Sequence, residues 1–134
     1  MVNSNDKIVS LKGGLGNQLF QYSFAKFLQK NFELNIKLDI SWFESQSLRK
    51  FELNSFLENN ELQIITKKPS FFENVISYRS EKILSKLLKN NYLPPVKYFN
   101  GYWQDIYFAN YLKFENNLNK KISKKNINKD YYII

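Results

Sequence analysis

The chain has 134 residues and a formal net charge of +8, and it contains neither cysteine nor histidine. Disulfides, thiolate metal sites and histidine catalysis are therefore excluded, so any chemistry must use carboxylates, amides, hydroxyls, Lys, Arg or backbone N–H groups. The length suits one globular domain, and no apolar run approaches the ~20 residues that span a bilayer. Residues 1–7 are polar and give no secretory signal, so we expect a cytoplasmic protein with at most peripheral contact at the inner face of the membrane.

The first part of the chain predicts a strand, a helix and a second strand. Residues 7–11 are mostly apolar, and the apolar side chains of 19–28 recur at helical spacing. Asn17 is the expected N-cap of this helix. Residues 34–39 alternate apolar and polar side chains, which is typical of a strand. Two strands joined by a helix are most simply parallel, which gives an α/β fold.

Further elements follow the same pattern. Residues 62–66 and 96–100 are predicted strands, 72–88 form a long basic amphipathic helix, and 107–114 form a short helix. We therefore expect a parallel sheet flanked by helices in a domain of residues 1–115. A Lys/Asn-rich tail, 116–134, follows this domain and ends in an apolar stretch that is typical of the start of a strand.

A glycine-rich loop, Lys-Gly-Gly-Leu-Gly-Asn-Gln at residues 12–18, joins the first strand to the first helix. Such a loop brings bare backbone close to a ligand, and the helix N-terminus offers N–H groups to an anion such as the diphosphate of a sugar nucleotide. The loop lacks the end of a Walker A motif, and Leu19 stands where the dinucleotide fingerprint has its third glycine. A purely structural turn is the alternative interpretation.

The string Gly-Gly-Leu-Gly-Asn-Gln-Leu-Phe-Gln at residues 13–21 resembles the N-terminal signature of the α-1,2-fucosyltransferase family, glycosyltransferase family 11. Residues 38–42, 49–53 and 99–105 are similar to the same family in the same order. The resemblance implies the Rossmann-like N-terminal half of a GT-B-type enzyme of polysaccharide biosynthesis. Such enzymes transfer L-fucose from GDP-fucose to the 2-hydroxyl of a galactose-terminated glycan, without a metal or other cofactor.

The resemblance also implies a C-terminal half that binds most of the donor and carries a His-x-Arg-Arg-x-Asp signature. This chain has no histidine and no Arg-Arg pair. We therefore expect residues 116–134 to lead into a missing donor-binding domain, and the chain alone to be an inactive N-terminal fragment.

Site residues are carried over from the family motifs. The resemblance places the donor beside Gly14, Gly16, Asn17 and Gln18. It places the acceptor beside Asp39, Tyr102, Trp103 and Gln104. The motifs name no catalytic residue. Lys12 either adds positive charge or faces solvent.

Plain structural interpretations stay open for the acceptor-side residues: a cap or turn for Asp39 and a packed strand end for residues 102–104. The charge and aromatic content leave a second function class open, a basic module that binds nucleic acid or another anion without catalysis. No nucleic-acid motif accompanies that charge, so nucleic acid is not an expected partner. The amphipathic segment 72–88 is open to a membrane-surface role or to packing on the sheet.

Overall fold

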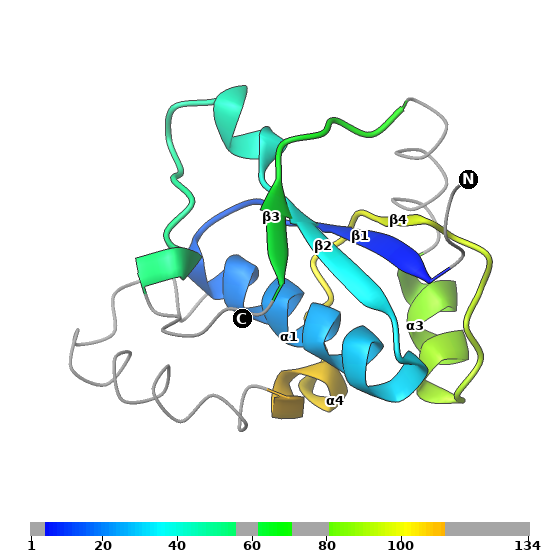
Figure 1. Ribbon diagram of the computed structural model, residues 1–134. Coiled ribbons are helices and arrows are strands. Elements are labelled where there is room, and N and C mark those ends of the chain that lie inside the picture. Colours follow the sequence, from blue (N-terminus) through cyan, green and yellow to red (C-terminus); the bar gives the residue numbers. More distant parts are fainter. Residues whose placement is uncertain (1–4, 56–61, 71–80, 112–134) are drawn as a thin grey trace.

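The computed structural model describes residues 5–55, 62–70 and 81–111 (Figure 1). Its sheet consists of β1 (Asp6–Ser10), β2 (Asn35–Asp39), β3 (Gln63–Ile65) and β4 (Tyr98–Phe99). The order is β3-β2-β1-β4, and each neighbouring pair is parallel. The predicted α/β class is therefore confirmed, and the carboxyl ends of all four strands meet at one edge of the sheet.

Helix α1 (Leu15–Phe32) connects β1 to β2. The predicted N-cap at Asn17 is wrong, because Gly14 holds that position with φ −76° and ψ 178°. Gly13 has a φ of 80°, a left-handed conformation that glycine adopts without strain. This turn lets the helix begin at Leu15, one turn earlier than its apolar periodicity indicates, so Asn17 lies inside the first turn.

The remaining helices are shorter. They are α3 (Glu81–Lys89), α4 (Ile106–Ala109) and two 3₁₀ turns, Ser41–Glu44 and Leu53–Ser55. Predicted helical residues 72–80 and 112–114 lie outside the described residues, and so do the 115/116 boundary and the tail. Among the described helices, none is both long and apolar enough to cross a membrane.

The core brings α1 together with the segment that follows β4. Phe24 of α1 stacks on Trp103 with ring centroids 3.9 Å apart and planes 4° apart, and the Phe108 ring meets Phe24 edge-on. All three side chains are buried. This packing fixes the course of residues 100–108 and so determines which side chains stand at the carboxyl edge of the sheet.

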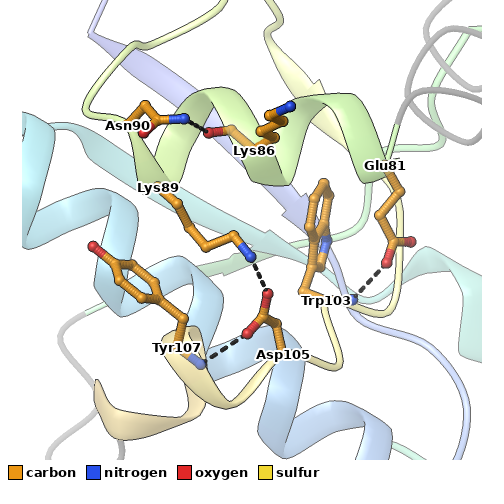
Figure 2. A network of polar contacts seen from close by, with 7 residues as sticks. All are labelled: Glu81, Lys86, Lys89, Asn90, Trp103, Asp105 and Tyr107. Carbon is orange, nitrogen blue, oxygen red and sulfur yellow. Dashed lines mark hydrogen bonds and ion pairs between the residues drawn. The ribbon is translucent and has the colours of Figure 1, made fainter.

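Polar contacts hold the same segment against α3 (Figure 2). The Glu81 carboxylate accepts hydrogen bonds from the backbone N–H groups of Tyr102, at 3.0 Å, and Trp103, at 3.2 Å. Asp105 pairs with Lys89 at 2.6 Å and caps α4 by accepting from the Tyr107 N–H at 2.9 Å. Both ends of α3 are therefore tied to the chain after β4.

Candidate functional site

A cavity of about 470 Å³ opens at the carboxyl edge of the sheet, where parallel α/β folds usually bind ligands. Segments at the ends of all four strands contribute to this strand-end cavity. Its lining residues are Ser10, Lys12, Ser41, Trp42, Ser45, Lys68, Pro69, Tyr98, Asn100 and Tyr102. Hydroxyls, an amide, two lysines and three aromatic side chains make this lining suited to a polar ligand with flat or ring-shaped faces.

Lys12 is the most enclosed charged group of the strand-end cavity, with 7% of its surface exposed. Its ammonium donates to the Asn100 side-chain oxygen at 2.7 Å and lies 4.7 Å from the centroid of the Tyr102 ring. Burial lowers the pKa of Lys12, and the negative charge of Glu81 partly opposes that shift. The sequence left Lys12 between a charge role and a solvent-facing one, and the structure places it inside the cavity.

Gln21 joins two walls of this cavity. Its side-chain oxygen accepts from the Lys12 backbone N–H at 2.9 Å, and its amide donates to the Gly101 carbonyl at 3.2 Å. Gln21 is fully buried on α1. The side chain therefore sets the spacing between the loop after β1 and the loop after β4, which carries Tyr102.

Asp39 lies at the end of β2, and none of its surface is exposed. Its carboxylate accepts from the N–H and hydroxyl of Ser41, from the Lys67 N–H and from the Tyr98 hydroxyl, at 2.6 to 3.0 Å. These partners come from the segments after β2 and β3 and from β4. In the structure Asp39 holds the floor of the strand-end cavity together and is not itself among the lining residues.

A second hollow, of about 340 Å³, lies at the glycine loop. We call it the glycine-loop hollow, and its lining residues are Gly14, Leu15, Leu48, Arg49, Lys50 and Glu52. It brings the N-terminal end of α1, where backbone N–H groups and the helix dipole favour an anion, next to two basic residues, Arg49 and Lys50, and one acidic residue, Glu52. The glycine loop therefore borders a hollow.

Gln18 keeps the 49–53 segment beside the glycine loop. Its amide donates to the carbonyls of Gly13, at 3.0 Å, and Lys50, at 2.8 Å. Its oxygen accepts from the N–H groups of Glu52 and Leu53, at 3.0 and 3.2 Å. Because Gln18 is fully buried, it positions the hollow and does not reach into it.

The other predicted residues lie in different surroundings. Gly16 is buried in the first turn of α1, and Asn17 is half-buried and accepts from the Gln104 amide at 2.6 Å. Tyr102 is 38% exposed and lines the strand-end cavity, whereas Trp103 is 1% exposed and belongs to the core. The structure thus places the residues predicted on the donor side at the N-terminal end of α1, and Tyr102 and Gln104 in the loop after β4. The Asn17–Gln104 hydrogen bond joins these two segments.

The similarity is to a glycosyltransferase. The O-antigen biosynthesis glycosyltransferase WbnK of Escherichia coli is 34% identical to this chain in an alignment of 122 residues. The alignment covers 73% of this chain and 40% of WbnK. The chain thus spans less than half the length of this curated relative. No protein-family model matches the sequence, and no solved structure does so. The similarity to WbnK supports the prediction that this chain belongs to a transferase. The parallel α/β architecture is consistent with a Rossmann-like glycosyltransferase domain.

Several lining residues were not identified from the sequence as site residues. In the strand-end cavity they include Trp42, Lys68 and Asn100, and in the glycine-loop hollow Arg49 and Lys50. All but Lys68 lie in or beside the stretches that resemble the fucosyltransferase family. Their location in these stretches could have identified them as site residues from the sequence. Each stretch lies near the carboxyl end of a strand or beside the glycine loop.

Proposed function

We propose that this chain forms the N-terminal α/β domain of an α-1,2-fucosyltransferase, which moves L-fucose from GDP-fucose to the 2-hydroxyl of a galactoside. The observation that carries the proposal is the glycine-loop hollow, where the first turn of α1 faces Arg49 and Lys50. The ordered family motifs and the similarity to an O-antigen glycosyltransferase support it. The part of WbnK that this chain does not match leaves room for a second domain to complete the donor site.

On the donor side, the leaving group of the reaction is a nucleoside diphosphate, whose negative charge grows as the glycosidic bond breaks. The backbone N–H group of Leu15 and the cations of Arg49 and Lys50 line the hollow and are suited to stabilise that charge. The N–H group of Gly16 is the next one in the first turn of α1. Such an arrangement does the work that a divalent metal does in other nucleotide-sugar enzymes, so we propose that none is needed here.

On the acceptor side, Tyr102 offers an aromatic face and Gln104 an amide. Aromatic rings pack against the apolar faces of sugars, and amides bond sugar hydroxyls. The hydrogen bond from Gln104 to Asn17 holds the loop after β4 in a fixed position relative to the first turn of α1. We propose that this fixed position sets the distance between the donor sugar and the acceptor hydroxyl.

The proposal is tested by titrating the labelled 134-residue chain with GDP-fucose and, separately, with methyl β-galactoside, while backbone amides are followed by NMR. GDP-fucose is expected to shift the amides of Leu15 and Gly16, and the galactoside those of Tyr102 and Gln104, both in the millimolar range. Methyl β-glucoside is the matched control sugar. Equal shifts with both glycosides, or none at Leu15 and Gly16 with GDP-fucose, would contradict the proposal.

A further inference from the structure

We propose that the strand-end cavity binds a carboxylate or phosphate group carried by a sugar of the acceptor glycan. The inference rests on the proposed function, because the cavity adjoins the acceptor side through Tyr102. It goes further by assigning the acceptor a negative charge, which a neutral galactoside lacks.

The charge of the lining carries the inference. Lys12 and Lys68 line the cavity, and no Asp or Glu is among the described residues that line it. Two carboxylates, Glu81 and Asp39, lie nearby, and neither is among the lining residues. Glu81 accepts hydrogen bonds from the backbone of Tyr102 and Trp103, and Asp39 accepts them from Ser41 and Lys67. The side chains that line the cavity therefore present positive charge to a ligand that enters it.

Lys12 is placed to contact such a group. Its ammonium is held inside the cavity by Asn100 and by the face of the Tyr102 ring, so its position is fixed before a ligand arrives. Burial disfavours the charged form of this amine. An anion beside it compensates that cost, and a charge-assisted hydrogen bond in an enclosed site is about twice as strong as a neutral one.

The remaining lining matches a sugar ring. Ser10, Ser41 and Ser45 bring hydroxyl groups, and Trp42 and Tyr102 bring aromatic faces. The Ser41 hydroxyl donates to Asp39, so its oxygen can still accept a hydrogen bond from a sugar hydroxyl. A volume of about 470 Å³ is within the range of small-molecule sites and admits a substituted monosaccharide.

The test compares D-galacturonate, D-galactose 6-phosphate and methyl β-galactoside as ligands of the full chain, with affinities from NMR titration. The acidic sugars are expected to bind about tenfold more tightly than the neutral one, as one charge-assisted bond implies. Comparing the two acidic sugars tells a carboxylate from a phosphate, and inorganic phosphate shows whether the sugar ring contributes.

Variants locate the binding. Lys68→Ala and the near-isosteric Lys12→Met are each expected to remove the tenfold preference, whereas Lys82→Ala, which removes an exposed lysine of α3, keeps it. Lys68 is exposed, so its variant reports on binding even if the Lys12 variant fails to fold. Loss of the preference in Lys68→Ala supports the inference.

Three results would overturn the inference: equal affinity for acidic and neutral galactosides, an unchanged preference in Lys68→Ala, or displacement of galacturonate by equimolar GDP. The last result would assign the cavity to the nucleotide. Donor binding is measured separately, through the amides of Leu15 and Gly16. Failure of the inference about acidic sugars can therefore be told apart from failure of the proposed transferase function.

Discussion

Gln18 offers the sharpest test of how the glycine-loop hollow is built. The Gln18→Leu variant keeps the side chain's size and removes four hydrogen bonds, two donated and two accepted. Each neutral bond contributes about 1 kcal/mol net, and the N–H of buried Leu53 would lose its partner. We expect the free energy of unfolding to fall by about 2–4 kcal/mol, a large part of the roughly 5–15 kcal/mol typical of a domain.

The assay is urea unfolding followed by the fluorescence of the two tryptophans, Trp42 and the buried Trp103, with hydrogen exchange at the Leu53 amide as a local measure. Gln29→Leu makes the same chemical change on a half-buried position of α1 and is expected to alter stability by less than about 0.5 kcal/mol. Because Gln18 holds the 49–53 segment, Gln18→Leu should also weaken GDP binding. A loss below about 1 kcal/mol with normal protection at Leu53 would refute this reasoning.

Two further predictions concern Asp39 and Asp105. Asp39→Ala removes the acceptor to which the buried Ser41 and Tyr98 hydroxyls donate and should cost about 3–5 kcal/mol. Asp39→Asn can keep the two backbone bonds, turn its amide to the hydroxyls and cost less than about 2 kcal/mol. Equal losses on urea unfolding would contradict this. The hydrogen bond from Lys89, with that from the Tyr107 N–H, holds the pKa of Asp105 below its ordinary value. The stabilisation is therefore present above the ordinary pKa and lost as pH falls through the lowered one. Asp105→Asn should cost at most about 1 kcal/mol at neutral pH, since the pair is partly exposed, and the difference from the parent should vanish in acid. A difference in unfolding free energy that persists or grows at low pH would exclude this explanation.

The sequence predicted the elements whose signal is local. Strands β1 and β2 and helix α1 follow from periodicity within a few turns of chain, and the glycine loop between them was recognised from its composition. The start of α1 was missed because it depends on the left-handed turn at Gly13 and not on apolar spacing. The fold class followed correctly from these elements, since two strands joined by a helix lie parallel.

The sites depend on partners far apart in the sequence, which no local pattern reveals. Asp39 meets residues 28 and 59 positions further along the chain, and its burial follows from those contacts. Trp103 looked like a sugar-stacking residue, but its ring is packed on Phe24 across the core. Lys12 was ambiguous because its enclosure requires Asn100 and Tyr102, which β4 brings beside β1.

The central claim is that the N-terminal end of α1, with Arg49 and Lys50, receives the diphosphate of a sugar nucleotide. It is tested most directly by titrating the chain with guanosine, GMP and GDP while the amides of Leu15 and Gly16 are followed by NMR. Affinity should rise with each phosphate, and the rise should disappear in the Arg49→Ala/Lys50→Ala variant but persist in Lys82→Ala. Equal affinity for all three ligands, or shifts confined to residues away from this hollow, would contradict the account.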